Sequence, residues 1–223
     1  MSAFFITGTD TGIGKTLVSC ALLRAFAQQG FSVAGMKPVA AGSIDGELLN
    51  EDVRLLLAAS NVVIDKSLVN PYLLLAPVAP HIAAVKEKLV IDLAVIVSAF
   101  VGIQKQAEVV IVEGVGGFKV PLGEGCDTVD LARALGLPLI LVVGMRLGCL
   151  NHALLTVAEI ARTGLSLAGW VANCIDDQML CLQENIETLT TRIPAPLIGV
   201  VPYQSATSLV AIEQFLHLEK LIS

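Results

Sequence analysis

A short apolar segment that runs into a glycine-rich loop is the feature that most limits how this chain can fold. Residues Ala3–Thr7 have the composition of a buried strand, and Gly8-Thr9-Asp10-Thr11-Gly12-Ile13-Gly14-Lys15-Thr16 follows before a helical pattern begins. Glycines let the backbone approach a polyanion, and the helix N-terminus directs N–H groups at it. Lys15 supplies a positive charge, and the Thr16 hydroxyl can hold Mg2+. The sequence therefore predicts a phosphate site for ATP or GTP.

The spacing of this loop departs from the usual phosphate-binding motif. Five residues separate Gly8 from Gly14, whereas the common motif has four between its first glycine and Gly-Lys-Thr. The alternative is a glycine-rich turn from strand to helix that holds no ligand. The combination of strand, glycines, Gly-Lys-Thr and helix favours nucleotide binding over that alternative.

Length and composition favour one α/β domain that spans residues 1–223. Hydrophobic residues make up 55% of the chain and charged residues 15%, which is ample material for a core. The mean hydropathy of +0.77 raises the question of a membrane protein. However, the longest apolar runs, such as Leu137–Gly144, are too short to cross a bilayer and are typical of buried parallel strands. We therefore expect no membrane partner.

Three further compositional features narrow the function. No basic leader precedes the apolar Ala3–Ile6, so a cytoplasmic location is expected. A net charge of -6 without a Lys/Arg cluster disfavours nucleic acid as a partner. The five cysteines form no Cys-x-x-Cys pair, which argues against a zinc site or a disulfide framework; they are Cys20, Cys126, Cys149, Cys174 and Cys181.

Strand-like and helix-like segments alternate along the chain. Apolar runs predict strands at Ala3–Thr7, Ser32–Lys37, Val109–Glu113, Leu139–Val143, Leu167–Asn173 and Leu197–Val201. Helical periodicity predicts helices at Lys15–Gln29, Glu51–Ala59, Ile91–Gln106, Thr128–Leu135, Leu150–Thr163 and Gln178–Thr191, with a last one near Leu209–Leu221. This alternation predicts a P-loop NTPase-like parallel sheet of about seven strands with helices on both faces. The irregular, proline-containing stretch Ala41–Lys88 is a candidate for substrate-facing loops.

Ligands of parallel sheets bind at the carboxyl ends of the strands, so polar residues there become candidates. Lys37 ends the second strand, where it either reaches solvent or serves an anionic ligand. Glu113 ends the third strand and is followed by three glycines within four residues. It is either a second Mg2+ ligand beside the phosphate site or a carboxylate that caps the glycine turn. Asp52 starts a helix, where the helix dipole would stabilise a carboxylate without any metal, so its role stays open.

The carboxyl ends of the later strands add two candidates. The segment from Arg146 to His152 enters a helix whose N–H groups could bind a carboxylate. A structural or surface role is favoured over catalysis for His152, because neither an acidic residue to orient it nor a nucleophile is apparent nearby, and catalysis is similarly disfavoured for Cys149. Asn173 could read a nucleobase edge through its amide, or it could be an ordinary turn residue.

Taken together, these segments resemble the dethiobiotin synthetase family over almost the whole chain. The resemblance rests on Gly-Thr-Asp-Thr-x-x-Gly-Lys-Thr at 8–16, Lys37-Pro38-Val39-Ala40, Val112-Glu113-Gly114-x-Gly116-Gly117, Leu147-Gly148-Cys149-Leu150-Asn151-His152 and Gly169-Trp170-Val171-Ala172-Asn173. The longer loop belongs to the pattern of that family. Its spacing thus becomes a family feature rather than a defect.

The resemblance implies a homodimer that uses ATP and Mg2+ to close a ureido ring from 7,8-diaminopelargonate and CO2. One amine takes up CO2 as a carbamate, whose oxygen attacks the γ-phosphate, and the second amine then displaces phosphate. Lys15 and Lys37 would flank the transferring group, and Thr11 would contact the carbamate. Positioning and cationic stabilisation are what phosphoryl transfer chiefly requires.

The resemblance also implies three sets of binding residues. The Mg2+-binding positions of the family correspond to Thr16, Asp52 and Glu113 in this chain. Nucleotide positions match Gly12, Ile13, Gly14, Lys15, Thr16, Leu17, Asp52, Glu113, Gly114, Val115, Gly116, Asn173, Cys174, Pro202, Tyr203 and Gln204. Substrate positions match Thr11, Lys37 and Ala41, with Gly148, Cys149, Leu150 and Asn151 receiving the distal carboxylate across the dimer.

The chain departs from the family pattern at three places. Ala41 stands where a serine commonly touches substrate, and loss of one hydroxyl contact is of order 1 kcal/mol. Gly12 replaces an often acidic residue, and Ser205-Ala206-Thr207 lacks an expected acidic residue near the ribose. The lysines and the metal positions are retained, so a competent enzyme is expected, with weaker substrate or nucleotide affinity as the effect of these changes.

Two other classes of P-loop protein remain as alternatives. A ParA/MinD-like ATPase switch that dimerises on ATP would carry an extra lysine early in the loop, where this chain has Thr9-Asp10-Thr11. A GTPase would carry Asn-Lys-x-Asp, whereas Asn173-Cys174-Ile175-Asp176 lacks the lysine. Both are therefore less favoured than the synthetase.

Overall fold

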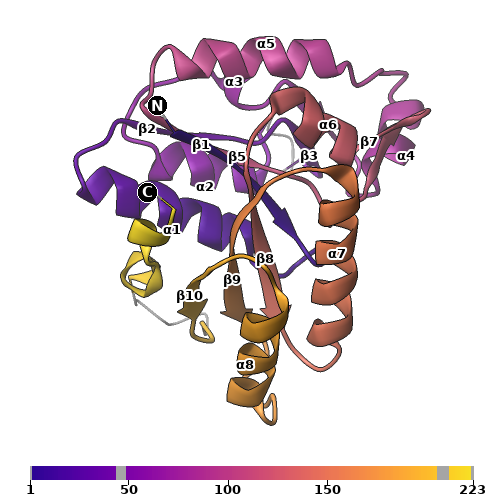
Figure 1. Cartoon of the computed structure of the whole chain (residues 1–223). Helices are drawn as coiled ribbons and strands as arrows, with labels where there is room; N and C mark the ends of the chain where they lie inside the picture. Colours follow the sequence, from indigo (N-terminus) through magenta and orange to yellow (C-terminus); the bar gives the residue numbers. More distant parts are fainter. Residues whose placement is uncertain (1, 44–48, 205–210, 222–223) are drawn as a thin grey trace.

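The computed structural model describes residues 2–43, 49–204 and 211–221 (Figure 1). Its elements in chain order are β1 (Ser2–Gly8), α1 (Lys15–Gln28), β2 (Val33–Met36), β3 (Val39–Ala41), α2 (Glu51–Ala59), α3 (Lys66–Val69), β4 (Tyr72–Leu74), α4 (Pro80–Lys86), α5 (Leu93–Gln104), β5 (Val109–Glu113), β6 (Pro121–Gly123), β7 (Cys126–Asp127), α6 (Thr128–Leu135), β8 (Leu139–Met145), α7 (Cys149–Thr163), β9 (Leu167–Cys174), α8 (Leu182–Arg192) and β10 (Leu197–Val201). Two 3₁₀ helices, η1 (Ile212–Phe215) and η2 (Leu218–Lys220), follow.

Six of these strands form one parallel sheet in the order β10-β9-β8-β1-β5-β2. From β1 the chain runs first to β2 at one edge and returns to β5 beside β1, and it then adds β8, β9 and β10 on the other side of β1. Such a switch of strand order opens a crevice at the carboxyl ends of the strands. The loop that follows β1 lies at that crevice. The predicted fold class is confirmed, with six strands in the described part of this sheet against about seven expected.

Successive side chains of the strands point to opposite faces of the sheet, and both faces are covered by helices. Phe4 and Ile6 of β1 pack in the cluster that includes Phe26 of α1, whereas Phe5 packs in the cluster that includes Phe100 of α5. Successive side chains of a strand point to opposite faces, so a strand buried on both faces must be apolar throughout. Helices α5, α6, α7 and α8 pack on the Phe5 face and α1 on the opposite one (Figure 1).

The β9 strand carries Trp170, the only tryptophan of the chain. Its side chain is fully buried among residues of β8, α7 and α8, and the indole Nε1 has no hydrogen-bond partner among the described residues. Along β9 the chain is buried from Gly169 to Cys174. Apolar packing therefore stabilises the half of the sheet that contains β8 and β9.

Several local expectations differ from the structure. The expected helix near Leu209–Leu221 is wrong for the residues described there, since His217 N–H donates to Ile198 O and Leu216 bridges Gly199 of β10, which splits the segment into η1 and η2. Leu209 itself lies outside the described residues. The α8 helix begins at Leu182 rather than Gln178. The second strand ends at Met36, one residue before the expected Lys37. Finally, α3, α4, the parallel β3–β4 pair and the antiparallel β6–β7 pair were not predicted.

Within the ranges described, no helix combines the length and the apolar character needed to cross a bilayer.

Candidate active site

The loop between β1 and α1 is shaped by two glycines with left-handed backbone. Gly12 has φ 72° and Gly14 has φ 84°, a region that L residues other than glycine rarely adopt. A Cβ at Gly14 would lie 2.1 Å from Asn173 Nδ2. That amide donates to Ile13 O at 2.7 Å and is buried. Asn173 at the end of β9 therefore ties the loop to the sheet, and only glycine fits at position 14.

Lys15 begins α1, and its ammonium is folded back over the loop. Lys15 Nζ donates to Asp10 O at 2.8 Å. Burial and the neighbouring Lys37 lower the pKa of Lys15 to about 8, despite the carboxylates nearby. The neighbouring cation and burial thus disfavour the charge of Lys15 until an anion arrives.

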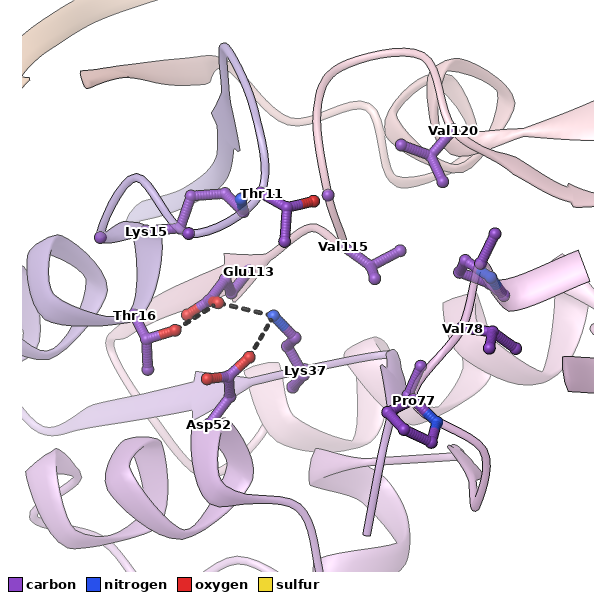
Figure 2. Close-up of a pocket in the computed structure, with 16 residues that line it drawn as sticks. Thr11, Lys15, Thr16, Lys37, Asp52, Pro77, Val78, Glu113, Val115 and Val120 are labelled. Atoms are coloured by element: carbon purple, nitrogen blue, oxygen red, sulfur yellow. Dashed lines mark hydrogen bonds and ion pairs between the residues drawn. The ribbon is translucent and has the colours of Figure 1, made fainter. Parts of the chain in front are cut away.

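Lys37 lies at the centre of the site, 3% exposed (Figure 2). Its Nζ lies 2.6 Å from Glu113 Oε1, 2.9 Å from Asp52 Oδ2 and 3.1 Å from Gly114 O. Burial alone would lower the pKa of Lys37, but the two carboxylates outweigh burial and hold it above its ordinary value. The lysine is therefore charged at neutral pH, and all three of its N–H donors are used.

The oxygen atoms around Lys37 fit a magnesium ion. Thr16 Oγ1 donates to Glu113 Oε1 at 2.8 Å, so the hydroxyl and carboxylate of the predicted metal positions meet. Glu113 is 1% exposed, and its Oε2 is a buried acceptor without a hydrogen-bond partner in the described structure. Lys37 holds the pKa of Asp52 below its usual range, against the raising effect of burial. Oxygen donors of this kind are what Mg2+ prefers, and it takes few of them from the protein.

These residues open onto a cavity of about 790 Å³. Its wall on the loop side is polar, and the opposite wall is apolar (Figure 2). The lining residues are Thr11, Gly12, Gly14, Lys15, Thr16, Lys37, Ala41, Asp52, Pro77, Val78, Ala79, Pro80, Glu113, Val115, Gly116 and Val120. A cavity with cations at one end and apolar side chains at the other suits an anionic group attached to an aliphatic chain.

A second hollow of about 230 Å³ lies on the other side of the loop. It is lined by Gly12, Gly14, Leu17, Asn173, Cys174, Ile175, Tyr203 and Gln204. Pro202 lines an adjoining hollow of about 360 Å³ together with Cys174 and Tyr203. The glycines of the loop therefore lie between the larger cavity and a smaller pocket lined by both polar and apolar side chains.

Comparison with known proteins identifies the family of this chain. Residues 2–209 match a family model described as an AAA domain. Proteins named ATP-dependent dethiobiotin synthetase BioD are 62% identical in Aromatoleum aromaticum (90% of each chain covered) and 54% identical in Nitrosospira multiformis (90% and 88%). The chain belongs to the dethiobiotin synthetase family.

Solved structures of other P-loop proteins share the fold. The MinC:MinD cell division complex of Aquifex aeolicus has a TM-score of 0.61 at 16% identity, covering 98% of this chain and 88% of the other. MinD of Pyrococcus horikoshii, complexed with Mg-ADP, has a TM-score of 0.59 at 15% identity, with the same coverage. At such identities the likeness shows the fold alone, whereas the dethiobiotin synthetase family is shown by sequence.

Most of the residues that the dethiobiotin synthetase resemblance singled out meet around the two hollows. Ile13 is buried beneath the loop, where it packs against Gly144, and Gly114 lies behind Lys37 as a carbonyl acceptor. The exception is the segment Gly148-Cys149-Leu150-Asn151, which lines neither hollow within this chain. It forms the start of α7, and the Cys149 side chain is buried in the core beneath it.

Several cavity residues were not assigned from the sequence. Pro77, Val78, Ala79 and Pro80 form one apolar wall, and the prolines of the irregular stretch were the available signal for it. Asp10 was also missed: its Oδ1 accepts from Thr11 N at 2.8 Å and its Oδ2 from Arg146 at 2.6 Å. The sequence could have indicated this contact, because a carboxylate inside a phosphate-binding loop repels the phosphates unless a nearby cation compensates its charge.

Proposed function

We propose that this chain is an ATP-dependent dethiobiotin synthetase, which closes the ureido ring of dethiobiotin from 7,8-diaminopelargonate and CO2 with formation of ADP and phosphate. The observation that carries the proposal, beside the family, is that Lys15, Lys37 and Thr11 face one cavity with an apolar far wall. A phosphate-binding loop alone would fit many NTPases. A second, buried lysine next to an aliphatic chamber fits a phosphoryl acceptor that is itself anionic.

The side chains have distinct roles in this proposal. Lys37 and Lys15 stabilise the charge that accumulates as the carbamate oxygen attacks the γ-phosphate, and Thr11 orients the carbamate. The second amine then attacks the carbamoyl carbon and releases phosphate. Electrostatic stabilisation by groups already in place is usually the largest catalytic contribution in such reactions.

Thr16, Asp52 and Glu113 would hold Mg2+, which neutralises charge on the ATP phosphates when bound. The Oε2 of Glu113 would be available for the metal, whereas Asp52 would exchange its contact with Lys37 for it. This exchange would leave the Lys37 ammonium free to bind the carbamate and γ-phosphate.

The nucleotide would lie across the loop, with its base in the hollow beside Asn173. The amides and side chains that contact it are those implied by the resemblance, from Gly12 to Leu17, from Gly114 to Gly116, at Asn173 and Cys174, and from Pro202 to Gln204. The expected departure at Ser205-Ala206-Thr207 lies outside the described residues.

We further propose that Gly148-Cys149-Leu150-Asn151 receives the distal carboxylate of a substrate bound to the partner subunit. The start of α7 offers N–H groups, and within one chain it lines neither hollow. A homodimer, a single domain over residues 1–223 and a cytoplasmic location stay predictions. Size-exclusion chromatography with light scattering tests the dimer, and a monomer with full turnover would contradict it.

Ala41 lines the cavity. The family pattern that this chain resembles commonly has a serine at this position. Thr11 and Thr16 are the only hydroxyl side chains among its described lining residues, and Ser43, the hydroxyl nearest to Ala41 along the chain, is not one of them. We therefore expect no compensation for the missing contact, and an Ala41→Ser variant should bind the diamine up to about fivefold more tightly, equivalent to about 1 kcal/mol.

The direct test is incorporation of labelled bicarbonate into dethiobiotin by the purified protein with diamine, Mg2+ and either ATP or GTP. Product with ATP is expected, and its absence would refute the proposal. The Lys37→Gln variant should lose at least about a hundredfold in turnover of folded protein, as expected for loss of a transition-state contact. The ParA/MinD-like alternative would give ATP hydrolysis without dethiobiotin.

A further inference from the structure

The main chain at Lys37 belongs to neither of the two sheets it connects. The β2 strand ends at Met36, which pairs with Val112, and β3 begins at Val39. Pro38 has no N–H to donate. Lys37 therefore lies outside the strand pairing of the large sheet, and its backbone N–H and C=O need other hydrogen-bond partners.

They are held instead by the segment that joins α3 to β4. Lys37 N–H donates to Val69 O at 2.9 Å. Lys37 O accepts from Asn70 Nδ2 at 2.6 Å, and the same amide donates to Tyr72 O at 3.2 Å. Asn70 ends α3 and is half-buried. One side chain thus bridges the carbonyl of Lys37 and the first residue of β4.

We propose that Asn70 is a positioning residue that sets where the Lys37 ammonium lies. It fixes the backbone from which the Lys37 side chain extends, while Glu113 and Asp52 fix the other end. This inference rests on the proposed function of Lys37 and assigns a role to a residue outside the cavity lining. Among the described residues, the hydrogen bonds of Asn70 reach neither the nucleotide loop nor the proposed metal positions.

The geometry makes the site sensitive to this contact. Lys37 is held at both ends within a buried space, so a shift of its carbonyl moves the ammonium relative to Glu113 and the cavity. Misplacement of a catalytic group by about 1 Å can cost about a hundredfold in rate. Loss of the Asn70 amide also leaves a carbonyl without a partner, which favours rearrangement of the backbone.

The test compares Asn70→Ala and Asn70→Asp with wild type in the dethiobiotin assay. Asn70→Asp keeps the shape of the side chain and removes both N–H donors. Both variants should lower kcat by roughly ten- to a hundredfold, while the KM for ATP and the affinity for ADP, measured by calorimetry, stay within about twofold because the loop is untouched.

Asn61→Ala is the matched control. Asn61 holds the end of β2 opposite to Lys37: it accepts from Val33 N at 2.7 Å and donates to Phe31 O at 2.8 Å. Its loss should lower thermal stability and leave kcat per folded molecule within about twofold. If Asn70 mattered only for folding, its variants would behave in the same way.

A second comparison asks whether Asn70 acts through Lys37. In a Lys37→Gln background, Asn70→Ala should change kcat by less than about twofold, because residues that act as one unit are not additive. Full kcat of either Asn70 variant, or an equal loss with and without Lys37, would overturn the inference. Absence of product from wild type would instead refute the proposed function, so the two failures are distinct.

Discussion

At the scale of single residues, Lys37 is the side chain on which the site depends. Its three donors are bound to Glu113, Asp52 and Gly114, and Glu113 is almost fully buried. Removing one partner of a buried ion pair leaves an uncompensated charge, which is costly even when the pair itself adds little to stability. The lysine therefore has a structural role as well as its proposed catalytic one.

We expect Lys37→Gln to lower the free energy of unfolding by about 3–5 kcal/mol in the absence of metal. Because Mg2+ can compensate the carboxylates in place of the ammonium, it should raise the melting temperature of the variant more than that of wild type. Thermal melts followed by circular dichroism, with and without Mg2+, measure both. In Lys119→Gln, which removes a half-exposed ion pair with Glu159, the effect of Mg2+ should match wild type; an equal Mg2+ effect in Lys37→Gln would contradict the argument.

At the scale of elements, the contact between the nucleotide loop and β9 decides the geometry of both hollows. Asn173 holds the loop by its amide, and Gly14 leaves just enough room for that amide. The loop is thus set by a strand that lies two places away in the sheet, beyond β8. Packing between these elements, and not the motif alone, fixes where its N–H groups point.

Gly14→Ala should therefore weaken ATP binding by at least about tenfold, because a Cβ cannot coexist with the amide and the left-handed backbone is strained. Gly30→Ala is the control: Gly30 has φ 91° with no atom within 4 Å of a built Cβ. It should cost about 1 kcal/mol of stability and leave ATP affinity unchanged. Calorimetric titration with ATP analogues measures the difference, and equal affinities of the two variants would show that the clash is relieved.

The sequence predicted those elements whose own residues determine them. The ends of α2, β5, α6 and β10 agree with the prediction, since a cap or a run of buried residues marks each. Asp127 shows why for α6, where it caps the helix through Val129 N and Asp130 N. In contrast, β3 and β4 have three residues each and exist by pairing with each other, a contact that local periodicity does not encode.

The same distinction holds for the site. Lys15, Thr16, Lys37 and Glu113 could be found because they end a strand, directly follow one or belong to a motif, and the carboxyl ends of parallel strands meet. The wall formed by Pro77–Pro80 and the Asn70 contact depend on how a long connection folds back over β2. That folding arises from tertiary packing, so the sequence indicated a region but not its residues.

At the scale of the whole molecule, the cysteines differ sharply in their surroundings. Burial raises the pKa of Cys20 to about 12, and burial also raises the pKa of Cys149 and Cys174. Cys126 is half-buried, with its pKa raised by burial, and Cys181 is exposed at the start of α8. Thiolates are the reactive form, so buried thiols with raised pKa react slowly.

A thiol reagent at pH 8 should therefore label about one cysteine per chain rapidly, and all five only after denaturation. Cys181→Ser should remove the fast phase and leave the slower ones unchanged. Mass spectrometry of labelled peptides identifies the site. Fast labelling of Cys20 in the native protein would mean that α1 opens from the sheet far more readily than its burial implies.

The single indole of Trp170 gives this molecule a built-in optical probe. Its emission arises from the half of the sheet that contains β8, β9 and β10, three positions before Asn173 on the same strand. A base that settles against Asn173 would alter that emission without any label, whereas events confined to Lys37 and the β3–β4 pair would leave it nearly constant. Fluorescence can thus separate occupation of the base pocket from rearrangement around the catalytic lysine.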